Sequence, residues 1–444
     1  MNSIPPITLV ILLFGFIFVL NGGGKNLAYL ASVSLIFHNA YISFFGTLLR
    51  PSQIIYLLFM LLMFLYLILS KEHQVTFDKK YDKPLLFCIY TIPASIFANI
   101  AAGGEYVIPA HSKGFGSSVQ AQINDLVPIA INSGILTQNI YVVFPIVVYY
   151  FLRKLDFKIL ENCINYYVYS VAFLTIWNII SVIEISAING YNMIHITNYL
   201  VGREGGTGST MGLGFTRIGG FVGEPSHYAY MALPAFGYVI GKSLNYNKNN
   251  KKWNSLALLF IFGLIISFST SGFVSFGLLL FVYSLYNFNK KIFFYLTMFF
   301  MLIVIALYLV FGEYIDAFWQ YNMAKINLGE GSFAIRMWSI KHNLMLLLKY
   351  PLFGIGIGSG GALGGLVTFL SNIGIIGVII FYFCFREISP IFSKSILFAI
   401  YALIIFNIIT GDLSTFFSPI FALLFAYASK ENFINSQGKK LRLI

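Results

Sequence analysis

Apolar segments long enough to cross a lipid bilayer recur along the whole chain. A transmembrane helix needs roughly 20 apolar residues to span about 30 Å of hydrocarbon. By that measure we predict spans at about 5–21, 27–48, 53–70, 84–102, 130–152, 163–186, 226–242, 255–270, 272–288, 292–311, 364–384, 394–410 and 416–429. A transmembrane β-barrel would instead show short alternating segments. The sequence therefore predicts an all-α fold, a polytopic integral membrane helical bundle with about 12–14 transmembrane helices, as a single membrane domain over residues 1–444.

Composition agrees with this class, because 58% of the 444 residues are hydrophobic and only 10% are charged. Such a chain cannot cover a water-soluble domain with polar side chains. Cys88, Cys163 and Cys384 fall in or at the edge of apolar spans, so no disulfide is expected. The span at 27–48 contains His38 and Asn39, and is therefore one long helix, two short helices or a surface helix.

The distribution of lysine predicts the topology. The formal net charge is +12, and lysines cluster in the short connections at 71–83, 154–158, 242–252 and 290–291 and in the tail after 430. Cytoplasmic loops of membrane proteins carry an excess of basic residues, so we place these connections and the C-terminus in the cytoplasm. The basic charge is then a topology signal, and no nucleic-acid partner is expected. The first apolar run lacks a basic leader, which favours a retained span over a cleaved signal peptide.

On this topology, long extracytoplasmic loops lie near 103–129, 187–225 and 312–363. Loops of this length usually bind or cover something, so function is expected there. Four of the seven arginines (Arg50, Arg203, Arg217 and Arg336) fall on that side, whereas the cytoplasmic connections rely mainly on lysine. The guanidinium fork suits phosphate, which predicts an anionic ligand. The alternative is that Arg203 and Arg217 pair with Glu204, Glu224 or lipid headgroups and only anchor their loop.

The loop at 187–225 ends in Glu224 and Pro225, at the head of a predicted span. Proline suits the first position of a helix, and the free N–H groups of a helix N-terminus favour a bound phosphate. Arg217 lies seven residues before Glu224 and could contact the same anion. Glu224 is the candidate general base, since partial burial would raise its pKa. It could instead cap the helix or pair with Arg217, which leaves His227 and His342 as alternative bases.

The loop at 312–363 is predicted to contain a helix with two functional stripes. Arg336, Ser339 and Asn343 share one face, and Trp338, His342 and Met345 line an adjacent one. This pattern also suits an amphipathic helix on the membrane surface, with Lys341 and Lys349 reaching the headgroups, and the two interpretations are compatible.

Glycines 356, 358 and 361 fit G-x-G-x-x-G, but no βαβ unit surrounds them, so a dinucleotide site is not expected. No residues have metal-ligand spacing.

The order of these motifs resembles bacterial O-antigen polymerases of the Wzy type, which share a superfamily with the O-antigen ligases. The resemblance rests on few residues: Arg217, Gly220, Glu224, Pro225 and Ser226, then Arg336, Trp338, Pro351, Gly354 and Gly356. It implies a multi-pass glycosyltransferase of the bacterial inner membrane with its active site on the periplasmic side. The enzyme would join undecaprenyl-pyrophosphate-linked oligosaccharide repeat units without a metal or cofactor, in contact with membrane lipids and with a chain-length regulator of the Wzz type as a partner.

Within this interpretation, Arg217, Glu224 and Arg336 are the predicted catalytic residues. The predicted substrate-binding residues are Arg203, Gly220, Ser226, His227, Trp338 and His342. The arginines would stabilise the charge on the leaving pyrophosphate in place of a metal.

Departures from the family pattern decide between its members. Many relatives have a T-x-S-R turn where this chain has Ser269 to Gly272, so no arginine role carries over there. The ligases carry a His-Asn pair where this chain has Leu363 and Gly364, which favours a polymerase over a ligase. A flippase for lipid-linked oligosaccharides is the competing function, but such carriers usually place ionisable residues near the middle of their spans. Here few occur, chiefly Glu184 and Asp412 near span ends.

Overall fold

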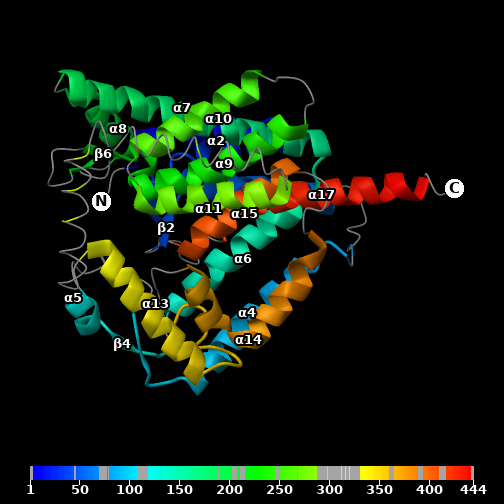
Figure 1. Cartoon of the computed structure of the whole chain (residues 1–444). Coiled ribbons are helices and arrows are strands. Elements are labelled where there is room, and N and C mark those ends of the chain that lie inside the picture. The colour runs from blue at the N-terminus through cyan, green and yellow to red at the C-terminus, as the bar shows by residue number, and fades with distance from the viewer. Residues whose placement is uncertain are drawn as a thin grey trace.

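The structure is a computed structural model that describes residues 4–44, 47–69, 78, 80–108, 119–131, 133–188, 190–202, 208–210, 216–245, 251–267, 269–287, 298, 312, 316, 320, 331–359, 365–388, 394–409 and 417–441. The described part is an all-α membrane protein, as predicted (Figure 1). Its strands are confined to short two-stranded antiparallel hairpins. Large apolar side chains such as Leu69 and Ile89 are exposed on the outer helices, which suits a surface that faces lipid rather than water.

A described helix coincides with every predicted span except 27–48 and 292–311, and the second of these lies almost entirely outside the described residues. The bundle helices are α1 (Pro6–Leu20), α2 (Gly24–Ser34), α3 (Pro51–Leu69), α4 (Pro84–Ala101), α6 (Ser133–Lys154), α7 (Phe157–Ile188), α9 (Pro225–Asn245), α10 (Lys251–Ile266), α11 (Thr270–Asn287), α14 (Gly365–Phe385), α15 (Lys394–Ile409) and α17 (Pro419–Leu441). Among the described residues, helices α3, α4, α6, α7 and α14 are each long and apolar enough to cross a bilayer.

Proline marks the start of several of these helices. Helices α3, α4, α9 and α17 each begin at a proline, at residues 51, 84, 225 and 419. The missing N–H costs nothing at the first helical position, and the fixed φ angle is already helical. The prediction that a helix begins at Pro225 is therefore confirmed.

The segment 27–48 is neither a single long helix nor one of the predicted alternatives. Helix α2 ends at Ser34, and the chain then turns into a hairpin of β1 (Ile42–Phe44) and β2 (Thr47–Leu49), with Ile42 opposite Leu49. A tertiary contact explains the break. The ring of Phe37 lies 5.2 Å from that of Phe221, and the Asn39 N–H donates to the Phe221 carbonyl at 3.3 Å.

The core of the bundle forms where α9 packs closely on α15. A Cβ atom on Gly237 would lie 2.5 Å from the Phe398 carbonyl oxygen, and one on Gly241 would lie 2.2 Å from the Ser395 Cα. Small residues four apart let two helices approach closely, which is the usual way helices associate in membranes. This packing buries most of α9, so its first turn is held on a rigid support.

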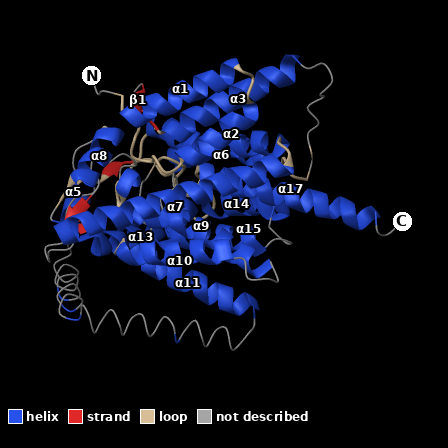
Figure 2. Cartoon of the chain, turned by 90° about the horizontal axis from the view of Figure 1, so that it is seen from above, coloured by secondary structure: helices blue, strands red, loops and turns tan. Residues whose placement is uncertain are grey.

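The segments predicted as extracytoplasmic loops carry short elements of their own. They contain β3 (Tyr106–Val107), α5 (Val119–Asn124), β4 (Val127–Pro128), α8 (Asn192–Val201), β5 (Gly208–Thr210), β6 (Thr216–Ile218), the 3-10 turn η1 (Gly220–Val222) and α13 (Gly331–Lys349). In Figure 1, α5, α8, β6 and the start of α13 lie at the left end of the molecule, whereas α17 runs to the C-terminus at the right. Figure 2 shows the same separation from above.

Candidate functional site

The centre of the candidate site is a tight glycine turn, residues Gly219–Gly223, that joins β6 to α9. Gly220 has a φ of +59°, a conformation that side chains other than glycine rarely adopt. A Cβ atom there would also lie 2.3 Å from Oδ1 of Asn178 on α7. The turn therefore fits against α7 only because residue 220 is glycine. The contact gives Gly220 a structural role in positioning the turn. Its predicted role in substrate binding stays a prediction.

Aromatic side chains hold the turn in place. The ring of Phe221 lies 4.9 Å from Trp177 and 6.2 Å from Phe173, both on α7, in addition to its contact with Phe37. Phe221 is buried, and aromatic pairs of this kind contribute about 0.5–1.5 kcal/mol each beyond the area they bury. The turn and the first residues of α9 are thus fixed to two other parts of the bundle.

Three predicted site residues meet at the N-terminus of α9. The Glu224 side chain is exposed rather than partly buried, and its Oε2 accepts a hydrogen bond from Ser226 Oγ at 3.2 Å. His227 is half-buried, with Nδ1 3.3 Å from the Val222 carbonyl oxygen. A carbonyl oxygen can only accept, so this contact places a proton on Nδ1 and leaves Nε2 as the basic nitrogen of neutral His227. The site thus offers an exposed carboxylate and an oriented imidazole as bases.

The predicted arginines of this loop are placed only in part. Arg217 lies on β6, opposite Ser209 of β5, and its neighbour Ile218 is buried. The strand pairing fixes the Arg217 backbone three residues before Gly220, while its side chain, like all of Arg203, lies outside the described residues. The predicted pairing of Arg217 with Glu224 therefore stays a prediction.

The second predicted group lies on α13, and the helix is as predicted. Ser339 and Asn343 are buried on one face, with Arg336 half-buried beside them, and Asn343 Oδ1 accepts a hydrogen bond from Ser371 of α14 at 2.9 Å. On the adjacent stripe, the rings of Trp338 and His342 stack at 5.3 Å. The hydrogen bond between Ser371 and Asn343 anchors the face that carries Ser339 and Asn343 to α14.

The structure gives Lys349 a protein partner that the sequence did not predict. It forms an ion pair with Glu105, which also accepts a hydrogen bond from the Tyr350 hydroxyl at 3.2 Å. His342 Nε2 lies 3.0 Å from the Tyr106 carbonyl oxygen, so this histidine is engaged with β3. These contacts dock the C-terminal half of α13 on the first of the three loops. The reason is that the two loops share a small apolar core around Leu346.

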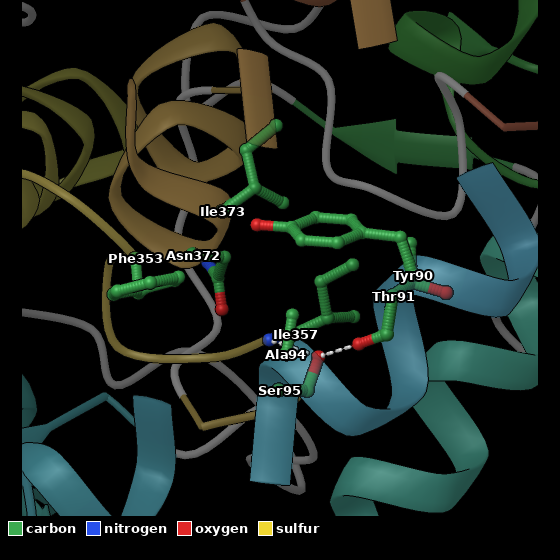
Figure 3. Close-up of a pocket in the computed structure, with 8 residues that line it drawn as sticks. All are labelled: Tyr90, Thr91, Ala94, Ser95, Phe353, Ile357, Asn372 and Ile373. Atoms are coloured by element: carbon green, nitrogen blue, oxygen red, sulfur yellow. Dashed lines mark hydrogen bonds between the residues drawn. The ribbon is translucent and has the colours of Figure 1, made fainter. Parts of the chain in front are cut away.

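The glycine-rich segment after α13, Pro351–Ser359, forms a turn that is buried from Gly354 onward and packs against a broken helix. Helix α14 is interrupted at Gly374, where the Ile355 N–H donates to the Ser371 carbonyl at 2.8 Å and the Gly356 N–H to the Asn372 carbonyl at 2.9 Å. Figure 3 shows a small pocket lined by this turn, α4 and α14, with Phe353 beside Asn372 and Ile357 beside Ser95. The Gly356 N–H is thus engaged with α14 rather than available to a dinucleotide.

Sequence reasoning missed two residues that the fold brings to the glycine turn, and it named a third, Arg50, only as one of the extracytoplasmic arginines, without a place in the site. His38, noted above only as a polar residue within the predicted span 27–48, lies with its ring 4.9 Å from that of His227. Arg50 lines the same pocket as His38. Asn178 is 4% exposed, and neither atom of its amide has a hydrogen-bond partner in the described part of the chain. The only signal in the sequence is that each interrupts an apolar run.

The ion pair between Glu105 and Lys349 gives a prediction for the docking of α13. The Lys349 ammonium lowers the pKa of Glu105, and Glu105 raises the pKa of Lys349. Because the pKa of Glu105 is lowered by folding, the stabilisation by the ion pair is fully present above the unfolded Glu pKa of about 4.3. It is lost as pH falls through the pKa of Glu105 in the folded protein. Because the pKa of Lys349 is raised by folding, the same stabilisation is fully present below the unfolded Lys pKa of about 10.4. It is lost as pH rises through the pKa of Lys349 in the folded protein. Between these limits the pair is intact.

We therefore expect Glu105→Gln to speed amide exchange over the last turns of α13 at neutral pH. Wild-type protein should reach the same faster exchange only when pH falls below the lowered Glu105 pKa. Hydrogen exchange read by mass spectrometry, corrected for the intrinsic pH dependence, measures this. Equal protection of the two proteins at neutral pH would show that the pair does not hold the helix.

Comparison with known proteins adds no support to the resemblance to O-antigen polymerases, which depends on the motif residues named above. No protein-family model matches the chain, and no curated protein matches it significantly. Among the described residues, no group of three or more His, Cys, Asp or Glu side chains is placed to hold a metal ion.

Proposed function

We propose that this protein is a surface-polysaccharide polymerase of the Wzy type, a glycosyltransferase acting at the periplasmic face of the bacterial inner membrane. It joins oligosaccharide repeat units carried on undecaprenyl pyrophosphate. The observation that supports this most is the placement of the two motif segments. The turn before α9 and the start of α13, distant in sequence, lie at the same end of the bundle as α5 and α8 (Figures 1 and 2).

The topology that goes with this proposal places that end outside the cytoplasm. The lysine-rich connections after α3 and α9 follow the far ends of those helices, and α17 carries the C-terminus in the same direction. A cytoplasmic location for the lysines then puts the glycine turn, β6 and α13 on the periplasmic side.

The proposed reaction is transfer of the growing glycan onto a newly delivered repeat unit. A hydroxyl of the acceptor sugar attacks the anomeric carbon of the donor, the bond from that carbon to the pyrophosphate oxygen breaks, and the electron pair leaves with undecaprenyl pyrophosphate. Arg217 and Arg336 stabilise the charge that develops on the leaving group, with Arg203 in support.

The proton of the attacking hydroxyl passes to a base at the head of α9. Glu224 is the first candidate, because it is exposed at the helix N-terminus and therefore accessible to an acceptor sugar. His227 is the alternative, since its Nε2 is the basic nitrogen when Nδ1 faces the Val222 carbonyl. The hydroxyl of Ser226 and the stacked rings of Trp338 and His342 supply polar and aromatic contacts for sugars.

Deleting the gene in its host, complementing it with wild type and resolving the surface glycan by electrophoresis tests the proposal. A polymerase predicts a ladder that collapses to single repeat units without the gene. Long glycan that accumulates on the carrier lipid would indicate a ligase instead. Absence of any repeat unit on the outer face would indicate a flippase and would exclude a polymerase.

One feature favours the flippase as a second candidate. Helix α14 is broken at Gly374 and receives a second chain segment there, and interrupted helices are common at the substrate sites of transporters. Against this, Glu184 is used structurally: its carboxylate accepts the N–H groups of Asn192 at 3.0 Å and Met193 at 2.8 Å, at the start of α8. Its carboxylate is therefore occupied at the end of α7, away from the middle of the span where a carrier would bind its substrate.

A further inference from the structure

A small pocket lies beside the glycine turn, and the reaction proposed above uses none of the residues that line it. Its lining comes from four parts of the chain: Leu35 and His38 after α2, Arg50 and Ser52 at the start of α3, Tyr230 and Met231 on α9, and Ser418, Pro419 and Ile420 at the start of α17. We call it the His38 pocket. Its enclosed space is about that of one water molecule, so it can receive one oxygen atom of a larger group.

The charged groups around the pocket are cationic. His38 is 8% exposed, its ring lies 4.9 Å from that of His227, and Arg50 lines the same cavity. Burial, followed by the charges of Arg50 and His227, lowers the pKa of His38 well below its usual value. Glu224, which directly precedes α9, is exposed and hydrogen-bonded to Ser226. The charges that act on His38 would therefore favour an anion in the pocket.

Helix N-termini add to this field. Helices α3 and α17 both begin at the pocket, and His227 sits in the first turn of α9. The first N–H groups of a helix have no partner within the helix and carry its partial positive charge. Ser52 and Ser418 are both buried in the lining, and Ser418 Oγ accepts the Phe421 N–H of α17 at 3.4 Å, which leaves the Ser418 O–H as a donor. A partly buried arginine at the edge, buried hydroxyls and two helix starts together make a site for phosphate oxygens.

We propose that the His38 pocket binds a phosphate or pyrophosphate group, held by Arg50, by the first turns of α3 and α17 and by the His38–His227 pair. The source of that group is either the carrier lipid, in which case the inference rests on the proposed function, or the headgroup of an anionic bilayer lipid. An anion among these side chains favours protonated His38, so binding takes up a proton and strengthens as pH falls.

The test is binding of inorganic pyrophosphate to the purified full-length protein in nanodiscs of neutral lipid, measured by calorimetry. Arg50→Ala is expected to weaken binding about tenfold or more, because it removes a charge-assisted contact. The matched control is Lys341→Ala, which removes an exposed cation on α13 and should leave binding unchanged. Unchanged affinity in Arg50→Ala would overturn the proposal.

The histidine is tested by the pH dependence between about pH 5 and pH 8. Because pyrophosphate itself gains protons in this range, wild type is compared with His38→Gln at each pH. Wild type should gain affinity over the variant as pH falls, and parallel profiles would overturn the role of His38. This arm also decides the matter if Arg50→Ala does not fold, which thermal unfolding in the same nanodiscs reports.

Two competitors distinguish the source of the phosphate. Displacement of pyrophosphate by a soluble polyprenyl pyrophosphate, but not by anionic lipid in the nanodisc, identifies the carrier. The reverse result identifies a bilayer lipid. Because this assay detects no glycan, pyrophosphate binding through Arg50 together with an unaltered glycan ladder in the deletion strain would support the pocket and exclude the polymerase. If the ladder is lost in the deletion strain but Arg50→Ala leaves pyrophosphate binding unchanged, the polymerase is supported and the phosphate site in the His38 pocket is excluded.

Discussion

Replacing Arg217 with alanine is expected to reduce glycan transfer about 100- to 1,000-fold, the usual effect of removing one preorganised group that stabilises developing charge. β6 pairs with β5 and fixes the Arg217 backbone immediately before the glycine turn, at the end of the bundle where α9 begins. The expected phenotype in the complemented deletion strain is a surface glycan of single repeat units. Quantifying the ladder at matched protein levels measures it.

Two further variants sharpen this prediction. Arg217→Lys should retain part of the activity, because lysine keeps the charge but loses the bidentate fork that suits phosphate. Lys341→Ala removes a cation from an exposed position of α13 and should keep the full ladder. A full ladder in Arg217→Ala would remove this arginine from the reaction.

Replacing Arg153 with methionine is expected to lower the free energy of unfolding by about 3–5 kcal/mol, because it removes the cation that pairs with the buried Asp82 carboxylate and leaves only Lys154, whose Nζ lies 3.8 Å from Asp82 Oδ2. Arg153 is nearly buried at the end of α6, where it pairs with Asp82 and with Asp78 at 2.8 Å. Asp82 is fully buried, and its Oδ2 also accepts the Asp78 N–H at 2.8 Å. Unfolding of the purified protein in mixed detergent micelles measures the loss.

The matched control is an exposed pair at the same end of the fold. Lys80 lies 3.9 Å from Glu387 with 51% of its side chain exposed, so Lys80→Met should cost less than about 1 kcal/mol. Adding Asp82→Leu to Arg153→Met should recover part of the loss, since it removes the uncompensated charge. A cost for Arg153→Met no larger than that for Lys80→Met would show that the buried network does not stabilise the fold.

Much of the fold follows from the sequence, because span length and helix starts are local properties. Apolar runs of suitable length predict helices at nearly all the positions where they are found, and proline marks the starts of α3, α9 and α17. The segment after α2 is the exception. Its apolar residues suit a helix, but the contact between Phe37 and Phe221 turns the chain instead, and no local pattern reports a contact between residues that distant in sequence.

The candidate site divides along the same line. Gly220, Glu224 and the α13 stripe are recognisable from residue type and spacing, since a glycine turn, a helix start and a helical face are each encoded within a few residues. The position of His38 beside His227 and Arg50 is not encoded in this way. It arises because α2, α3, α9 and α17 pack at one end of the bundle, which brings residues from across the chain to one pocket.

Local sequence patterns thus predict the class of protein, the positions of its helices and the residues at which those helices begin. The length of an apolar segment and the proline at its start are properties of about 20 consecutive residues, so they can be recognised in the sequence. Only the tertiary structure decided which polar groups meet: the Glu105–Lys349 pair, the Asp82–Arg153 network and the His38 pocket. Each depends on helix packing, in which close approach and burial select partners regardless of their separation along the chain.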